Sequence, residues 1–273
     1  VYVEASWKEK GPLGPVGETR WVESLRASGR SGVEAIVAHA DLSLGRDVRP
    51  VLRAHLDASP RVRGIRDMLA WHASRDVMDF NEQPGRSASP SWRAGFECLS
   101  EFGLSFDAFC YDTQLGEIAA LAGAYPEQPI MLCHMGGPVG IGGPYGEVGK
   151  TPRDRANALA RWRDLLSRVA SHSNVQLKLS GLAMPICGFG FGERQVPPST
   201  QEVVDAFAPL LEFAIETFGV ARCSFASNFP VEKASLTYAQ MFDVFETIAA
   251  TRPATERRAL FRDNAARFYR IDA

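Results

Sequence analysis

Short apolar runs alternate along this chain with longer segments in which apolar residues recur every three or four positions. The run at residues 130–133, Ile-Met-Leu-Cys, is typical of a buried strand, and His134 and a Gly-Gly-Pro turn signal follow it closely. By the same criteria we expect strands at residues 1–5, 32–38, 62–66, 104–110, 130–133, 174–181 and 221–226. We expect helices at residues 18–28, 47–58, 92–102, 114–124, 153–170, 200–217, 236–250 and 255–269.

These strand–helix units follow one another without a break in composition. Such alternation predicts a parallel sheet covered by helices, and the number of units indicates a (β/α)8 TIM barrel. The chain is one strand short of that barrel, and we expect the missing first strand to lie upstream of Val1. A dinucleotide-binding sheet is disfavoured, because no G-x-G-x-x-G sequence follows the first strand. We therefore expect one TIM-barrel domain, incomplete at its N-terminus, over residues 1–273.

Composition and charge narrow the class of protein. The 273 residues are 45% hydrophobic and 23% charged, which is typical of a soluble globular protein. The net charge of −2 gives no basic surface for nucleic acid, and no apolar run approaches the roughly 18 residues of a membrane span. The start of the chain does not resemble a signal peptide, and the 5 cysteines contain no C-x-x-C pair. We expect a cytoplasmic protein that acts on a small molecule, and the sequence leaves homo-oligomerisation open.

Polar residues occur at the end of nearly every predicted strand, which is where a TIM barrel carries its active site. Strand interiors stay apolar, and this contrast favours an enzyme over a binding module. The candidate site residues are Glu4, His39, Asp41, Arg66, Asp107, Tyr111, His134, Lys178, Ser180 and Asn228.

Three of these candidates each have a functional and a structural interpretation. The imidazole of His134 could ligate a metal ion or polarise a carbonyl group, or it could be a satisfied core histidine. Arg66 could bind a substrate carboxylate through two hydrogen bonds, or it could form an ion pair in the barrel wall. Lys178 lies in an apolar strand pattern, so its ammonium group requires a partner, which could be structural. We expect His55 and His172 to lie on helices and to face solvent.

The strand predicted at residues 104–110 leads to a further candidate for the site, Tyr111. A period of two residues places Asp107, Phe109 and Tyr111 on one face. If that face lines the barrel, the Tyr111 hydroxyl could donate to a bound oxyanion; otherwise Tyr111 is a core residue. His39, Lys178 and Asp107 join Arg66 as candidates for substrate binding.

Five stretches carry a more specific signal, and they are spread over nearly the whole chain. They are Val3-Glu4-Ala5, Gly64-Ile65-Arg66, His134-Met135-Gly136-Gly137-Pro138, Lys178-Leu179-Ser180-Gly181 and the segment from Arg222 to Val231, which contains Ser227-Asn228-Phe229-Pro230. With the last helix at residues 263–269, these stretches resemble the amidohydrolase-related TIM-barrel hydrolases. The resemblance is to the branch that contains sugar lactonases and pyrone-dicarboxylate lactonase.

This resemblance implies hydrolysis of a cyclic ester or a related carbonyl compound. In the family, an aspartate at the end of the last strand activates water, often with a divalent metal ion that acts as a Lewis acid. His134 matches a metal-binding histidine of the family, so one divalent ion, Zn or Mn, is expected in a metal-dependent form. Two features depart from the family pattern. The His-x-His pair of the first strand is absent from this chain, and Asn228, whose neutral amide is not a general base, replaces the aspartate.

The leading prediction is a lactonase that acts on a small carboxylated or sugar-derived lactone. Metal-free lactonases of the branch leave open a reaction in which His134, Tyr111 and Asn228 are the catalytic residues and Arg66 binds an anionic group. The base would then be unassigned, and Glu4, Asp41 or Asp107 could take its place only if the geometry allows it. The alternatives are a metal-dependent decarboxylase of an aromatic acid and a barrel that binds a ligand without turnover. We also expect the apolar loop at residues 184–191 to cap the pocket.

Overall fold

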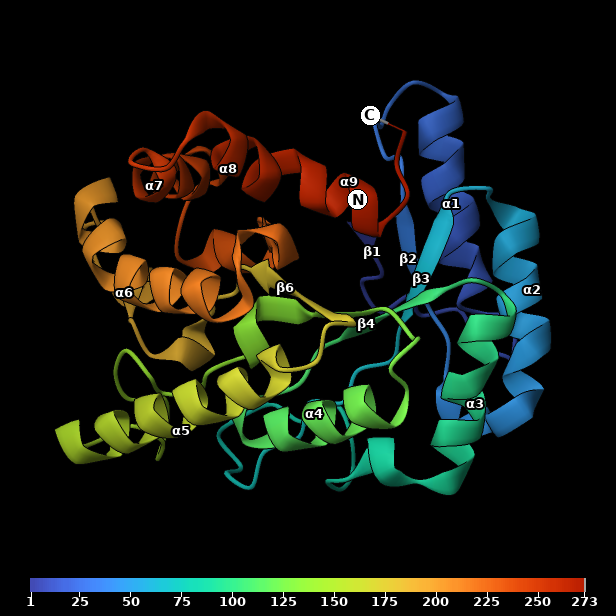
Figure 1. Ribbon diagram of the computed structural model, residues 1–273, viewed down its shortest axis with the longest axis horizontal. Helices are drawn as coiled ribbons and strands as arrows, with labels where there is room; N and C mark the ends of the chain where they lie inside the picture. Colours follow the sequence, from blue (N-terminus) through green and yellow to red (C-terminus); the bar gives the residue numbers. More distant parts are fainter. Residues whose placement is uncertain (273) are drawn as a thin grey trace.

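A seven-stranded parallel sheet forms the centre of the computed structural model, which describes residues 1–272. Its strands pair in chain order, each one parallel to the next. The strands are β1 (Tyr2–Val3), β2 (Ile36–His39), β3 (Val62–Arg66), β4 (Ser105–Ala108), β5 (Ile130–Leu132), β6 (Val175–Leu179) and β7 (Cys223–Phe225). The sheet is curled, with helices around its outside (Figure 1). The predicted fold, a TIM barrel that lacks one strand, is therefore confirmed.

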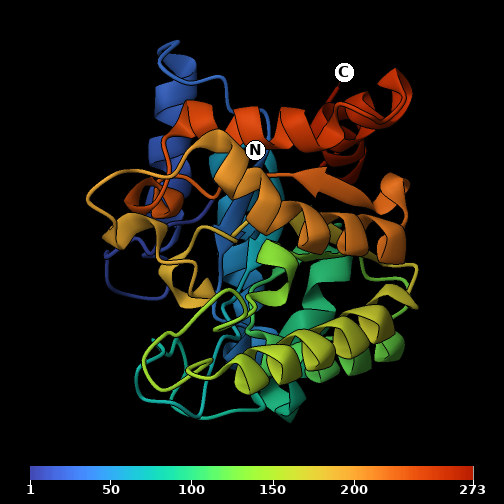
Figure 2. The same cartoon turned by 90° about the vertical axis from the view of Figure 1, so that its left-hand side faces the viewer.

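Helices follow the strands, and all but the last three return the chain from the end of one strand to the start of the next. They are α1 (Val16–Ala27), α2 (Arg49–Ala58), α3 (Pro90–Glu101), α4 (Leu115–Ala124), α5 (Pro152–Ala170), α6 (Thr200–Phe218), α7 (Tyr238–Ala249), α8 (Ala254–Arg258) and α9 (Asn264–Phe268). Most helices that follow one another in the sequence pack side by side. Figure 2 shows the long loops that follow β3, β5 and β6 gathered along one side of the molecule. Because all strands are parallel, this is the side of their carboxyl ends.

Side chains on the two faces of the sheet form different clusters. Ile65, Phe106 and Leu132 face the helices and belong to the main hydrophobic core. Val37 and Met131 belong to a smaller cluster that also contains Phe268 and Tyr269 of the C-terminal segment. The C-terminal segment therefore packs inside the curl of the sheet, whereas the other helices cover its outer face.

Two predicted helices differ from the structure: the one predicted at residues 47–58 begins two residues later, and the last one is interrupted. Residues 42–48 form 3₁₀ turns before α2, because Gly45 has a φ of 61° and a ψ of −138°, outside the helical region. The helix predicted at residues 255–269 is divided into α8, a π turn over Ala259–Asp263, and α9. Beside this turn, the Asn264 amide donates hydrogen bonds to the carbonyl oxygens of Val220 and Cys223, and so ties α9 to the start of β7.

The prediction that His55 faces solvent was wrong. Its side chain is fully buried, with Nδ1 2.8 Å from the Thr19 hydroxyl and Nε2 2.9 Å from the carbonyl oxygen of His39. Burial lowers the pKa of His55 to about 4, so the ring is neutral at pH 7. His172 is half-buried and lies after the end of α5 rather than on a helix.

No helix within residues 1–272 is long and apolar enough to cross a membrane.

Candidate active site

The carboxyl ends of neighbouring strands bring most of the predicted site residues to one edge of the sheet. Arg66 is the last residue of β3, His134 follows β5, Ser180 follows β6, and Asn228 lies shortly after β7. In a parallel barrel this edge is where catalytic groups gather. Their hydrogen bonds and ion pairs determine which of these side chains are engaged with the protein and which remain available to a ligand.

Arg66 forms an ion pair in the barrel wall, one of its two predicted alternatives. Its Nε lies 2.6 Å from the Glu4 carboxylate, and its Nη2 donates to the backbone oxygen of Glu4. The Arg66 carbonyl oxygen lies 3.0 Å from Nδ1 of His39. Within residues 1–272 the remaining nitrogen of Arg66, Nη1, makes no hydrogen bond, so one donor of the guanidinium is available to a ligand.

Lys178 finds its partner in Asp107, inside the curl of the sheet. Its Nζ lies 2.5 Å from Oδ2 of Asp107, and the Tyr269 hydroxyl donates to the same oxygen at 2.8 Å. Burial first, and the Asp107 charge second, raise the pKa of Tyr269 well above its ordinary value, so the phenol keeps its proton. The other oxygen of Asp107, Oδ1, is buried without a hydrogen-bond partner among residues 1–272. Lys178 and Asp107 are therefore bound mainly to each other.

His134 lies in a strained segment at the end of β5. Its φ is 55°, in the left-handed region that few non-glycine residues adopt, and Met135 has the same conformation with a φ of 53°. Asn228, with a φ of 51°, is a third such residue. Strained backbone of this kind is concentrated at functional sites, because surrounding contacts must hold it in place. The ends of β5 and β7 are thus marked by their conformation as well as by their residue types.

The His134 ring is held between Ser180 and Phe109. Its Nδ1 lies 2.9 Å from the Ser180 hydroxyl, and the ring meets the Phe109 ring edge to face at 5.4 Å. Burial first, and then the positive charges of Arg66 and Lys178, lower the pKa of His134 well below its ordinary value. The imidazole is therefore neutral at pH 7, and Nε2 is its remaining polar atom.

Tyr111 lies beyond the end of β4, so the strand periodicity used to place it does not extend that far. Its hydroxyl donates to the carbonyl oxygen of Met78 at 2.6 Å, and its ring packs against Phe109 and His72. The phenolic proton is thus engaged with the loop after β3, and the core interpretation of Tyr111 describes its position.

The structure adds Glu232, which sequence analysis missed. Its carboxylate is fully buried, and Oε1 accepts a hydrogen bond from the Asn228 amide at 3.0 Å. Burial raises the pKa of Glu232 to about 7, although Asn228 and the backbone N–H groups of Ala183 and Gly181 favour the ionised form. Oε2 is buried without a partner among the described residues. A buried carboxyl group that titrates near neutral pH beside a strand end is typical of a catalytic acid or base.

Gly181 connects Glu232 to His134. Its φ is 84°, and a Cβ at this position would collide with the Cβ of His134. The N–H of the same residue faces the Glu232 carboxylate. The glycine therefore allows the end of β6 to approach both groups, which places the carboxylate and the imidazole around one short segment of backbone.

Within residues 1–272, no three His, Cys, Asp or Glu side chains come close enough together to hold a metal ion. Asn228 is directed to Glu232, and the Asp107 carboxylate is bound to Lys178 and Tyr269. His134 is thus a single metal-ligand candidate, and this part of the chain does not by itself fit a metal centre.

The apolar loop at residues 184–191 lies on the carboxyl-end side of the sheet, where it was expected. The N–H groups of Gly140 and Gly142 donate to the carbonyl oxygens of Ile186 and Cys187, which ties this loop to the loop after β5. Met184 approaches Gly181, since a Cβ on that glycine would lie 3.0 Å from Cε of Met184. The loop therefore packs directly beside the His134 segment.

The amidohydrolase family model matches residues 21–271, and the chain belongs to this family. It is 34% identical to the uncharacterized protein y4mH of Sinorhizobium fredii, over 95% of this chain and 77% of that protein. It is also 28% identical to an L-fucono-1,5-lactonase of Burkholderia ambifaria, over 93% of this chain and 76% of the lactonase. The chain is thus an amidohydrolase-family hydrolase with lactonases among its relatives.

Solved structures agree with this assignment at the level of the fold. An amidohydrolase from Burkholderia multivorans, crystallised with bound zinc, has a TM-score of 0.72 at 22% identity. The match covers 92% of this chain and 78% of that one. The resemblance to amidohydrolase-related TIM barrels inferred from the sequence is therefore confirmed.

The Lys178–Asp107 pair leads to a stability prediction. Lys178→Met should lower the free energy of unfolding by about 3–5 kcal/mol, because it leaves the buried Asp107 carboxylate without a cation. Urea unfolding measures the loss. Combining it with Asp107→Asn should recover part of the stability, since no uncompensated charge then remains. Lys150→Met, which removes an exposed partner of Glu147, is the control and should cost no more than about 1 kcal/mol. Equal losses in Lys178→Met and the control would contradict the prediction.

Proposed function

We propose that this protein hydrolyses a lactone, the cyclic ester of a hydroxy acid. The observation that carries the proposal is the buried Glu232 carboxylate, hydrogen-bonded to Asn228 at the end of β7. The relationship to an L-fucono-1,5-lactonase supports a cyclic ester as the substrate. The sequence predicts a carboxylated or sugar-derived lactone as the substrate. In this proposal, the free Nη1 of Arg66 donates a hydrogen bond to an anionic group or an oxygen atom of that lactone.

Glu232 takes the role of general base in this proposal. A carboxyl group whose pKa is about 7 is half ionised at neutral pH and can both accept a proton from water and return it. Asn228 holds Oε1 by hydrogen bonding, which leaves Oε2 as the proton acceptor. The carbonyl oxygen of the Asn228 amide can accept a hydrogen bond from the attacking water and orient it. The neutral asparagine thus positions the base and does not replace it.

His134 polarises the lactone carbonyl. The Ser180 hydroxyl can donate to Nδ1 of His134, and we assign the ring proton to Nε2 on that basis. The Nε2–H then donates to the carbonyl oxygen and stabilises the negative charge that develops there. A neutral imidazole suits this role, because it forms the hydrogen bond without giving up its proton.

The reaction proceeds in two steps with these groups. Water attacks the carbonyl carbon, Glu232 takes its proton, and a tetrahedral intermediate forms with its oxyanion at His134. The intermediate collapses, the bond to the ring oxygen breaks, and Glu232 returns the proton to that oxygen. The product is the open hydroxy acid, and both residues regain their starting states.

A divalent ion bound at His134 is the second form of the site that we consider, since zinc is bound in the Burkholderia multivorans relative. Such an ion would supply Lewis-acid chemistry at the carbonyl oxygen. Metal analysis of the purified protein, with lactone hydrolysis before and after treatment with EDTA, separates the two forms. Activity that persists after complete metal removal supports the metal-free reaction. Loss of activity that zinc or manganese restores supports the metal-dependent one.

Glu232→Gln tests the base. Because the base must be ionised, kcat/KM of the parent should rise with pH through about 7 and then level off. The variant should lose about 10²–10⁴-fold in kcat/KM and show no such rise. Hydrolysis followed by pH-stat titration against a panel of lactones measures both quantities. An unchanged pH profile in the variant would assign the base elsewhere, and release of CO₂ from an aromatic acid would favour a decarboxylase instead.

The same variant has an effect on stability that does not depend on any substrate. The pKa of Glu232 is about 7 in the folded protein and near 4.5 when exposed, so the folded state holds the proton more tightly. The contribution of this group to stability is therefore greatest below about pH 4.5 and is lost as the pH rises to about 7. The loss is on the order of 3 kcal/mol. Urea unfolding across this range should show a shallower decline for Glu232→Gln than for the parent.

Asn228→Asp tests whether the general base is Glu232 or the residue at position 228, where the family has its aspartate. An aspartate there would place a second carboxylate beside Glu232, and like charges raise the pKa of such a pair. Activity at pH 7 should fall at least tenfold, and its pH profile should move to higher pH. A gain of activity would mean that position 228 is the place of the base. If neither the parent nor this variant hydrolyses any lactone in the panel, binding of a ligand without turnover becomes the leading hypothesis.

A further inference from the structure

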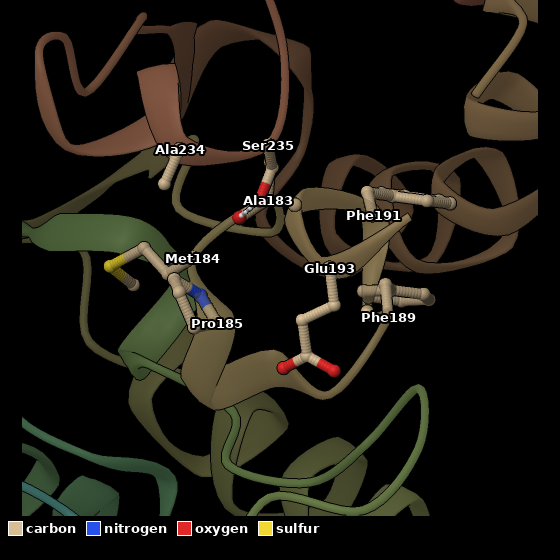
Figure 3. A pocket seen from close by; sticks show the side chains of 10 residues that line it. Ala183, Met184, Pro185, Phe189, Phe191, Glu193, Ala234 and Ser235 are labelled. Carbon is tan, nitrogen blue, oxygen red and sulfur yellow. Dashed lines mark hydrogen bonds between the residues drawn. The ribbon is translucent and has the colours of Figure 1, made fainter. Parts of the chain in front are cut away.

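We propose that a pocket beside the candidate active site binds an uncharged apolar substituent of the substrate, an alkyl or aryl group attached to the lactone ring. The inference rests on the lactone hydrolysis proposed above and narrows its substrate class. The pocket has a volume of about 130 Å³ and lies between the loop after β6 and the turn after β7. Figure 3 shows Met184 and Pro185 on one side of it, and Phe189 and Phe191 on the other.

The walls of the pocket are mainly carbon. Phe189 and Phe191 stack at 5.7 Å between ring centroids, and both rings pack against Phe207 of α6, which holds them in place. The two segments that form the pocket also meet directly, because a Cβ on Gly192 would collide with the carbonyl oxygen of Ala234. A rigid apolar wall of this kind favours an apolar group, which gains contact with carbon and leaves water.

Few polar side chains line the pocket. Ser235 donates its hydroxyl proton to the carbonyl oxygen of Ala183 at 2.7 Å, so this donor is already satisfied. Glu193 is the only other polar side chain in the lining. Several hydroxyl groups of a sugar ring would lose water here without gaining enough hydrogen-bond partners, and that loss is unfavourable. The side chains that line the pocket therefore disfavour the binding of a polyhydroxylated group.

Glu193 sets the charge of the pocket. Its side chain is exposed and projects between the two walls in Figure 3. Within residues 1–272 it forms no ion pair and no side-chain hydrogen bond. An unpaired carboxylate at the rim repels a second carboxylate, so an anionic substituent is disfavoured. An anionic group of the same substrate would instead lie towards Arg66.

The pocket adjoins the proposed catalytic groups through its own backbone. Ala183 lines the pocket, and its N–H faces the Glu232 carboxylate. Met184 also lines it and approaches Gly181, the glycine that lies against His134. Ala183 and Met184 thus belong both to the pocket and to the backbone around Glu232 and His134, and the proposal places the lactone ring at those two groups with its substituent in the pocket.

The size of the pocket limits the substituent. Apolar cavities of roughly 150 Å³ accept a benzene molecule. A volume of about 130 Å³ therefore suits one phenyl ring or a short alkyl chain. Each buried methylene should raise kcat/KM about fourfold until the pocket is full.

The experiment compares δ-valerolactone with its 5-propyl, 5-pentyl, 5-phenyl and 5-carboxypropyl derivatives. We expect kcat/KM to rise along the alkyl series and then level off, and the carboxypropyl compound to be worse than the propyl one. Ala234→Phe should fill the pocket from its exposed rim and abolish the preference for pentyl over unsubstituted lactone. Ala239→Phe, at an exposed position on α7 outside the pocket, is the matched control and should keep that preference. A flat alkyl series, or a preference that Ala234→Phe leaves intact, would overturn the proposal.

Two further measurements sharpen the test. Glu193→Gln should raise kcat/KM for the carboxypropyl lactone relative to the propyl lactone by about fivefold, because it removes a charge repulsion across a solvent-exposed rim. The corresponding δ-lactams, which resist hydrolysis, report binding by calorimetry even without turnover. If no lactone is hydrolysed, but pentyl lactam binds more tightly than the parent lactam and Ala234→Phe removes that gain, the reaction is disproved and the pocket is supported. Equal affinities for all lactams would disprove the pocket.

Discussion

The buried carboxylate of Asp107 is the interaction on which the rest of this structure depends. One of its oxygen atoms, Oδ2, accepts hydrogen bonds from Lys178 of β6 and from Tyr269 of the C-terminal segment. Strands that are two positions apart in the sheet are thus joined across its concave face. An ion pair in such a place is stabilising only when its hydrogen bonds are present, because removing both charges from water is costly. The three side chains therefore require one another, and together they join β4, β6 and the C-terminal segment inside the curl of the sheet.

His134 and Glu232 have different protonation properties in this arrangement. The positive charges of Arg66 and Lys178 act with burial to keep His134 neutral, whereas Glu232 lies on the other side of Gly181 and keeps a proton near pH 7 because it is buried. A neutral donor and a carboxyl group that can gain or lose a proton are complementary parts of an ester hydrolysis. The environment strengthens the neutrality of His134 and gives Glu232 a pKa that a glutamic acid does not have in water.

Much of the fold could be predicted from the sequence, because parallel strands with helices between them leave a strong periodic pattern. The run before His134 was placed within one residue of β5, and strand ends at Arg66 and Ser180 identified the correct edge of the sheet. Local pattern could not reveal partners that are distant in sequence. Glu4, which pairs with Arg66, is 62 residues away, and the two groups that satisfy His55 come from α1 and β2. Glu232 was missed because it lies in a short turn after a proline and not at a strand end, although its spacing of four residues from Asn228 was a usable signal.

The contact between Tyr269 and Asp107 spans 162 residues and joins the end of the chain to the interior of the sheet. During synthesis, the strands from β1 to β7 are complete before this tyrosine leaves the ribosome. Until then the Asp107–Lys178 pair lacks the third side chain that satisfies it, and the amino-terminal end of the sheet interior lacks Phe268. The order of the chain thus makes completion of this interior a late step of folding, which waits for Phe268 and Tyr269.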